Sequence, residues 1–236
     1  MKQYHECELK MKVFDENEEK KIIKNLKKMG HLGGRARLER DFILDNEKNS
    51  LKKRRILLRV REIAQDNKKE ILFTLKIKGN ATDFQDNIEI ETFAGNKDEH
   101  TIKQILEFIE KEINVHISSS IFKMNEIADI LKELRKIGIY SYNVVEKKRT
   151  EYIGEKTKAS LDVFPVPVGT YLEIEAESKE DLFNTIEQLG LERERFDKRN
   201  YGKIIAEATN GARQCLFDIK NYGKERMEND KKYTGR

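Results

Sequence analysis

The sequence predicts an α+β fold in which about eight strands close into a β-barrel with a charged lumen and helices pack on the outside. Three observations support this prediction. Charged and apolar residues alternate along several segments with the period of two that is typical of β-strands. Amphipathic segments of helical period lie among these strands. Acidic and basic residues both recur on the polar faces, and an enclosed lumen lets them pair, which reduces the cost of removing them from water.

The segment from Tyr4 to Val13 is the first to alternate in this way. One face carries Glu6, Glu8, Lys10 and Lys12. The opposite face carries His5, Cys7, Leu9, Met11 and Val13, which we expect to be packed. Taken alone, this pattern is more typical of a half-buried strand whose charged face meets bulk water. Its repetition along the chain is what favours an enclosed site.

The alternation returns in later segments. We expect strands over residues 35–45, 56–62, 71–78, 87–93, 140–148, 149–153, 159–163 and 170–177. Their charged faces carry Arg59, Arg61, Lys76, Lys78, Glu89, Glu91, Arg149, Asp162, Glu173 and Glu175. Helices are expected over residues 16–29, 101–113, 123–137 and 179–189, and in a last segment from Arg199. The apolar stripes of these helices are suited to cover the outer faces of the strands.

Composition argues against nucleic-acid-binding, disulfide-bonded and membrane-spanning proteins. Charged residues make up 38% of the 236 residues, but 47 bases nearly cancel 43 acids, so the net charge gives only weak support for a nucleic-acid partner. The two cysteines, Cys7 and Cys215, have no metal-binding or redox spacing and are expected to be free thiols. No apolar run is long enough to span a bilayer, and no secretory signal is present. We therefore expect a soluble cytoplasmic protein, with no membrane partner.

The charged faces suggest a chemistry. Carboxylates such as Glu6, Glu8, Glu173 and Glu175 offer the hard oxygen ligands that Mg²⁺ or Mn²⁺ prefers. Arg59, Arg61 and Arg149 offer forked donors for phosphate, while Lys10, Lys76 and Lys78 offer point charges. A divalent metal together with a ligand of several negative charges satisfies both sets. On charge count, a small-molecule triphosphate fits best.

These residues also carry a resemblance to a known family. Glu6-Cys7-Glu8-Leu9-Lys10 is similar to the ExExK signature of the CYTH superfamily, the triphosphate tunnel metalloenzymes. The resemblance continues in order through Leu57-Leu58-Arg59-Val60-Arg61-Glu62, Leu75-Lys76-Ile77-Lys78-Gly79, Glu89 and Glu91, Glu146-Lys147-Lys148-Arg149, Asp162, Leu172-Glu173-Ile174-Glu175 and Arg199-Asn200-Tyr201. It extends over residues 1–208. The short signature is weak in a chain so rich in Glu and Lys, whereas the ordered set is specific.

The resemblance implies an eight-stranded antiparallel tunnel that processes triphosphates with Mg²⁺ or Mn²⁺. It implies metal ligands at Glu6, Glu8, Glu173 and Glu175, with Asp162 near a second metal. It implies phosphate binding by Arg59, Arg61, Lys76 and Arg149, with Lys78 in support and Lys10 beside the metal and the terminal phosphate. A lumen acid such as Glu89, Glu91 or Asp162 is a candidate general base, although Glu89 and Glu91 could equally pair with Arg59 or Lys76 across strands.

The layout is most similar to the class IV adenylyl cyclase branch, which converts ATP to cyclic AMP and pyrophosphate. Ile43 departs from that branch, because an aromatic residue is usual there. A triphosphatase that releases orthophosphate from thiamine triphosphate, inorganic triphosphate or a nucleotide is the alternative. A non-catalytic module for polyphosphate, nucleotide or an RNA 5′-triphosphate end is a further alternative. The protein is expected to be a monomer or homodimer, with a tunnel domain over residues 1–210 and a charged extension over 211–236.

Several nearby polar residues are expected to be structural. Lys147 and Lys148 are predicted on the barrel exterior, and Asp41 and Asp45 are read as strand-end groups. Tyr201 is expected to pack the last helix across a tunnel mouth, with stacking on a base as the alternative. The segment from Lys220 is expected to be solvated.

Overall fold

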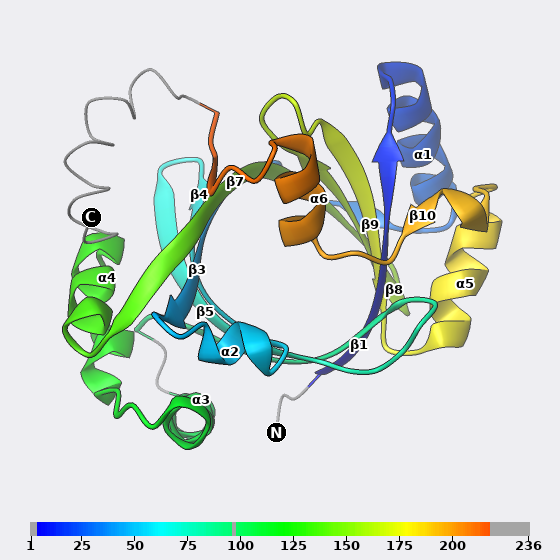
Figure 1. Ribbon diagram of the computed structural model, residues 1–236. Coiled ribbons are helices and arrows are strands. Elements are labelled where there is room, and N and C mark those ends of the chain that lie inside the picture. The colour runs from blue at the N-terminus through cyan, green and yellow to red at the C-terminus, as the bar shows by residue number, and fades with distance from the viewer. Residues whose placement is uncertain (1–3, 96–97, 218–236) are drawn as a thin grey trace.

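A closed β-barrel forms the centre of the computed structural model, which describes residues 4–95 and 98–217 (Figure 1). Eight strands of this described chain pair in the order β1–β6–β5–β4–β3–β7–β8–β9, and β9 pairs with β1 to close the ring. All these pairings are antiparallel. The barrel strands are β1 (Tyr4–Val13), β3 (Arg37–Asn46), β4 (Ile56–Gln65), β5 (Lys68–Lys78), β6 (Gln85–Phe93), β7 (Ile139–Ile153), β8 (Thr157–Val163) and β9 (Thr170–Ala176). The predicted fold class is confirmed.

Helices cover the outer apolar faces of the barrel on two sides. On one side α3 (Glu99–Ile113), η1 (Ser119–Lys123) and α4 (Ile127–Lys136) pack on β3 to β6, and the rings of Phe73 and Phe122 lie 4.3 Å apart in this cluster. On the other side α1 (Glu16–Lys28) and α5 (Lys179–Gln188) pack on β1, β8 and β9. Because apolar side chains turn outward under these helices, the charged side chains that alternate with them turn inward.

The remaining short elements lie outside the ring of eight strands. The helix α6 (Tyr201–Ala208) lies over one mouth in Figure 1 and packs on Phe164, Val168 and Tyr171. The other short elements are β2 (Leu32–Gly33), α2 (Ser50–Lys53), η2 (Arg193–Arg195), β10 (Phe196–Asp197) and β11 (Gln214–Cys215). Among them, β10 pairs with β1, and β2 and β11 pair with β7. The predicted solvated tail from Lys220 lies outside the described residues. No described helix has the length and apolar character needed to cross a membrane.

Element boundaries differ from the predictions where local geometry intervenes. The helix predicted over 123–137 begins only at Ile127, because a 3₁₀ turn precedes it and Met124 is extended. The two strands predicted over 140–148 and 149–153 form one strand, β7, which pairs with both β3 and β8. The helix α2 was not predicted, because its four residues carry no periodic signal. Its first turn is fixed by the Asp45 carboxylate, which accepts hydrogen bonds from the backbone N–H groups of Leu51 and Lys52, so Asp45 has the expected structural role.

Candidate active site

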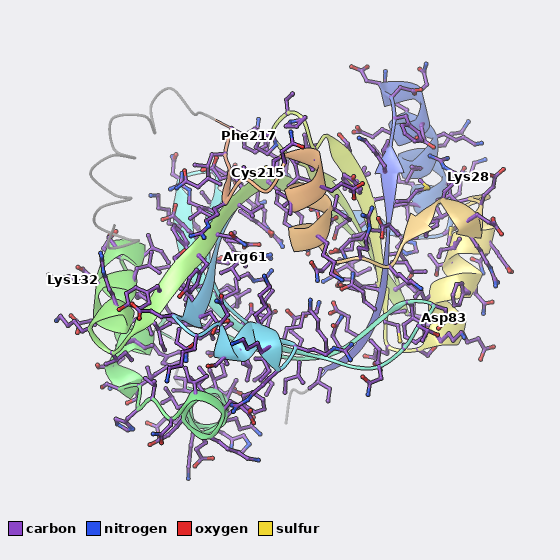
Figure 2. All side chains as sticks on the ribbon, viewed as in Figure 1. Lys28, Arg61, Asp83, Lys132, Cys215 and Phe217 are labelled. Atoms are coloured by element: carbon purple, nitrogen blue, oxygen red, sulfur yellow. The ribbon has the colours of Figure 1, made fainter. Side chains whose placement is uncertain are left out.

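The lumen of the barrel is lined by charged side chains from all eight strands, of which Lys76 on β5 and Glu89 on β6 are only partly buried. Figure 2 shows one of them, Arg61, on the inner side of the barrel wall. The buried charged residues that take part in this lining are Glu8, Lys10, Glu39, Asp41, Arg61, Lys147, Arg149, Asp162, Glu173 and Glu175. Such groups are tolerated away from water only when each is paired or hydrogen-bonded. The pairing pattern therefore defines the site.

Three carboxylates gather on one side of the lumen. Glu8 of β1 lies directly opposite Glu175 of β9, and Glu6 precedes Glu8 by two residues on the same face. One oxygen from each of the three lies within 4.8 Å of the others. Burial, followed by the Glu175 charge, raises the pKa of Glu6 well above its usual value. The pKa of Glu175 is also raised, first by burial. We call Glu6, Glu8 and Glu175 the acidic trio; crowded oxygen ligands of one charge fit a hard divalent cation.

Two lysines border the acidic trio. The Lys76 Nζ lies 2.5 Å from a Glu6 oxygen and 3.0 Å from a Glu8 oxygen. The Lys10 Nζ lies 2.9 Å from Glu8 and 3.0 Å from Glu173. Burial alone would raise the pKa of Glu8, but the charges of Lys10 and Lys76 lower it overall. Both ammonium groups are therefore held within reach of any phosphate oxygen that binds beside the trio.

Arg149 anchors the part of the lumen that adjoins Glu173. It donates to the Asp162 carboxylate through Nε and Nη2, at 2.6 Å each, and to Glu173 through Nη2 at 2.5 Å. The Lys147 Nζ donates to the same Asp162 carboxylate at 3.0 Å. Burial raises the pKa of Asp162, but Arg149 and Lys147 lower it overall, so this acid stays ionised.

Arg61 lies next to this cluster and is held by two further acids. Its Nε and Nη2 donate to the Asp41 carboxylate at 2.5 and 2.9 Å, and its Nη1 lies 2.9 Å from Glu39. Glu39 is fully buried, and Lys147 and Arg149 approach it at 3.6 and 3.9 Å. Burial would raise the pKa of Glu39, but these cations, Arg61 first among them, hold it well below its usual value.

Arg59 is held more loosely than Arg61. Its guanidinium lies 3.4 Å from Asp41 and 3.5 Å from each of Glu89 and Glu91. Its Nη2 donates to the Thr74 hydroxyl at 3.1 Å, while its buried Nε has no hydrogen-bond partner among the described residues. An arginine with spare donors inside a charged lumen is able to bind an anionic ligand.

The structure brings most of the predicted residues together and separates some. The carboxylates of Glu6, Glu8 and Glu175 cluster, whereas those of Asp162 and Glu173 accept hydrogen bonds from Arg149. The predicted phosphate-binding residues Lys10, Arg59, Arg61, Lys76 and Arg149 all project into the lumen. Glu89 and Glu91 face it from β6, and cross-strand pairing with Arg59 is present. Lys78 shares their lumen but forms no ion pair within the described chain.

Two expectations about polar residues were wrong. Lys147 was predicted outside but is 3% exposed and contacts Asp162, because Arg149 lies two residues later on the same face of β7. Asp41 was read as a strand-end group but lies inside on Arg61, because β3 pairs there with β4 and β7. Lys148 does point outward, with its Nζ 5.4 Å from the Phe217 ring centre.

Sequence reasoning also missed Glu39, Arg37 and Lys158. Glu39 holds Arg61, and Arg37 donates to Glu39 at 2.7 Å. Lys158 pairs with Glu175. Lys158 has the same strand parity as the predicted Asp162, so its signal was present, whereas no residue of the strand that carries Arg37 and Glu39 was predicted to enter the lumen. Only the register of the closed barrel shows which charges meet.

Tyr201 closes the lumen at the α6 mouth. Its ring packs on Phe164 at 4.7 Å and on Tyr171 at 6.0 Å between ring centres, which confirms the expected packing role. The Nζ atoms of Lys10 and Lys147 lie 5.0 and 5.1 Å from the centre of the same ring. Cation–π attraction of this kind helps to hold the two lumen lysines in place.

The described geometry agrees with a comparison to protein families. The sequence model of the CYTH domain matches residues 4–201. The chain belongs to the CYTH family. This family consists of triphosphate tunnel enzymes that depend on metal ions, so the barrel, the charged lumen and the acidic trio have a common explanation. No curated protein sequence matches the chain significantly.

Solved structures share the fold of this CYTH protein at low sequence identity. A "putative adenylate cyclase" from Vibrio parahaemolyticus is 16% identical, with a TM-score of 0.61 over 86% of this chain and 98% of that one. A protein from Pyrococcus horikoshii is 18% identical, with a TM-score of 0.56 over 86% and 98%. A "putative adenylyl cyclase" from Hippeastrum, described as having a dominant triphosphatase activity, is 15% identical, with a TM-score of 0.51 over 88% and 97%. At these identities the likeness shows the fold alone.

Proposed function

We propose that this CYTH protein is a divalent-metal-dependent enzyme that cleaves the triphosphate group of a nucleoside or other organic triphosphate. The observation that carries the proposal is the meeting of three crowded carboxylates with a set of buried lysines and arginines in one enclosed lumen. The acids suit a metal ion, and the cations suit phosphate oxygens. A neutral or cationic substrate would leave one of the two sets without a partner.

The acidic trio is the proposed metal site. Carboxylate oxygens from Glu6, Glu8 and Glu175 would hold Mg²⁺ or Mn²⁺, and the metal supplies charge neutralisation at phosphate oxygens and acidification of the attacking nucleophile. The family resemblance also implies Glu173 and Asp162 as ligands. Because both carboxylates hold Arg149, we propose that they orient this arginine toward the phosphate chain.

The lumen cations would bind the phosphate chain. Lys10 and Lys76 border the trio and are within reach of the same phosphate group as the metal. Arg59, Arg61 and Arg149 offer forked donors from β4 and β7, and Lys78 adds a charge near the α6 mouth. These groups stabilise the negative charge that accumulates on the transferring phosphoryl group and its leaving group.

Among the acids offered as general base, Glu91 is the best suited. Its side chain is 36% exposed, and partial desolvation followed by the Glu89 charge raises its pKa, which makes it a stronger proton acceptor. The pKa of Glu89 is lowered to about 2, since the charges of Lys76 and Arg59 outweigh the effect of burial. Asp162 is held ionised by Arg149 and is a weak base. We therefore propose Glu91 as the acceptor of the nucleophile's proton.

Two reactions suit the same lumen, and their products distinguish them. In the cyclase reaction the ribose 3′-hydroxyl attacks the α-phosphorus and pyrophosphate leaves; in the triphosphatase reaction water attacks the terminal phosphorus. Hydrolysis is the proposal that the described lining favours, because the side chains near the trio are charged, and the Tyr201 ring beside Lys10 is already packed on Phe164 and Tyr171. The adenylyl cyclase reaction is the second candidate, favoured by the layout of the sequence motifs.

The test is incubation of the full chain with Mg²⁺ or Mn²⁺ and, separately, ATP, thiamine triphosphate and inorganic triphosphate, followed by phosphorus NMR. Orthophosphate with a diphosphate supports hydrolysis, and pyrophosphate with cyclic AMP supports cyclisation. The variants Glu8→Gln and Arg61→Ala should lose turnover while keeping their far-UV circular dichroism. Tight, metal-insensitive binding without any product from the three substrates would support the binding-module alternative and overturn the proposal.

A further inference from the structure

Asn87 of β6 is a buried polar residue with an unused donor inside the lumen. It is 1% exposed, and its Nδ2 has no hydrogen-bond partner among the described residues. In the barrel register it lies directly opposite Glu6 on β1 and Lys78 on β5. Residues opposite one another on antiparallel strands share a face, so Asn87 lies between a member of the acidic trio and a lumen cation.

Leaving a buried donor unpaired is costly and calls for an explanation. An unsatisfied buried polar group destabilises a protein, because it gives up its hydrogen bonds to water and gains none in return. By contrast, Asn25 in α1 donates its amide to the Leu189 carbonyl at 3.1 Å, which is the usual arrangement. The orphan donor of Asn87 is therefore a group held ready for an acceptor that is not part of the protein.

Lys78 next to Asn87 is also without a protein partner. The lumen lysines Lys10, Lys76 and Lys147 each form ion pairs with carboxylates, whereas Lys78 forms none in the described chain. Burial and then the charge of Lys76 lower the pKa of Lys78 to about 8, so it is still largely protonated at neutral pH. A buried amide donor without a partner and an ammonium group without an ion pair lie side by side here, and such a pair makes a site for an anion rather than for a cation.

We propose that Asn87 is a substrate-binding residue whose Nδ2, together with Lys78, donates to a non-bridging oxygen of the phosphate group that lies nearest the α6 mouth. This inference rests on the proposed function and adds to it a direct contact that the family resemblance did not imply. The metal at the acidic trio and the Lys78–Asn87 donor pair would then hold neighbouring oxygens of the same phosphate chain. A neutral amide at this position orients the phosphate oxygen through a hydrogen bond without changing the net charge of the lumen.

The experiment compares two asparagine-to-leucine variants of the full chain. Thermal unfolding is followed over a titration with inorganic tripolyphosphate in Mg²⁺, which yields an apparent dissociation constant. Asn87→Leu should raise that constant by about 10- to 100-fold, the usual worth of a hydrogen bond to a charged group. Without ligand it should unfold at the same or a higher temperature than wild type. Asn25→Leu, the matched control, should unfold at a lower temperature and bind tripolyphosphate as wild type does.

A second substitution separates a phosphate donor from a metal ligand. Asn87→Asp keeps an oxygen beside Glu6 but loses the donor and adds negative charge, so tripolyphosphate affinity should fall below that of Asn87→Leu. Tighter binding by Asn87→Asp would overturn the inference in favour of a metal contact. If wild type is stabilised by tripolyphosphate and Asn87→Leu is stabilised equally, the inference fails while the proposed function stands. If wild type itself is not stabilised, the proposed function fails first.

Discussion

Replacing Arg149 by methionine removes the guanidinium that holds two buried carboxylates, and we expect a loss of about 3–5 kcal/mol in the free energy of unfolding at pH 7. The magnitude follows from the contacts. Arg149 makes two 2.6 Å bonds to Asp162 and one of 2.5 Å to Glu173, and the three residues are 5%, 0% and 4% exposed. Without it, Asp162 keeps the Lys147 ammonium at 3.0 Å, and Glu173 keeps the Lys10 ammonium at 3.0 Å.

The assay is urea unfolding monitored by circular dichroism. For a domain of this size each kcal/mol corresponds to roughly 2–4 °C in midpoint temperature, so thermal unfolding should shift by about 6–20 °C. The control is Arg193→Met, which removes a half-exposed pair with Glu187 and should cost less than about 1 kcal/mol. The double variant R149M/D162N should recover part of the loss, since it removes one of the two carboxylates left without Arg149.

The pH dependence of this loss gives a further check. The pKa of Asp162 is lower in the folded protein than in the unfolded chain, because Arg149 and Lys147 outweigh the effect of burial. The pair therefore stabilises the fold above the unfolded pKa of about 3.9, and this contribution disappears as the pH falls through the folded pKa. The difference between wild type and R149M should shrink below about pH 4. A loss under about 1 kcal/mol at pH 7, or an equal loss in Arg193→Met, would refute the reasoning.

Three further outcomes follow from other contacts. Because the pKa of Lys78 is about 8, KM for a triphosphate should be constant below that pH and rise by up to about tenfold per pH unit above it. Lys78→Arg should remove the rise. A wild-type KM that stays constant above pH 8 would contradict this prediction. Phe73→Ala should cost about 3–5 kcal/mol in urea unfolding, because its ring packs on Phe122, yet leave KM unchanged, and a changed KM would argue against a purely structural role. Glu175→Gln should weaken Mn²⁺ binding by more than about tenfold in calorimetry without lowering metal-free stability; unchanged Mn²⁺ affinity would remove Glu175 from the metal site.

Much of the barrel could be predicted, because charged and apolar residues alternate with unusual regularity along its strands. Charged residues at every second position of the segments around Glu6, Arg59 and Glu173 indicated strands with one polar face, and the outer apolar faces indicated the helices that cover them. What alternation cannot supply is register. The same pattern is compatible with many pairings, and only the observed one sets Glu8 opposite Glu175 and Asp162 opposite Arg149.

Three residues illustrate different limits of sequence-based prediction. Lys147 lies two residues before Arg149, so the two-residue alternation of a strand, applied consistently, would have predicted its side chain in the lumen. Glu39 is different, because an isolated acid on a mixed strand is indistinguishable by sequence from a solvated one. Its importance arises from three cations that converge on it from β4 and β7. Asn87 shares its strand parity with Glu89, but only the structure reveals that its amide is buried with a donor that has no partner among the described residues.

The most direct test of the account is a crystal structure of the full chain with Mn²⁺ and inorganic tripolyphosphate, in which anomalous scattering locates the metal. The account predicts Mn²⁺ at about 2.1 Å from oxygens of Glu6, Glu8 and Glu175. It also predicts phosphate oxygens in contact with Lys10, Lys76 and Arg59. Manganese located away from the acidic trio, or a phosphate chain bound outside the barrel, would contradict it.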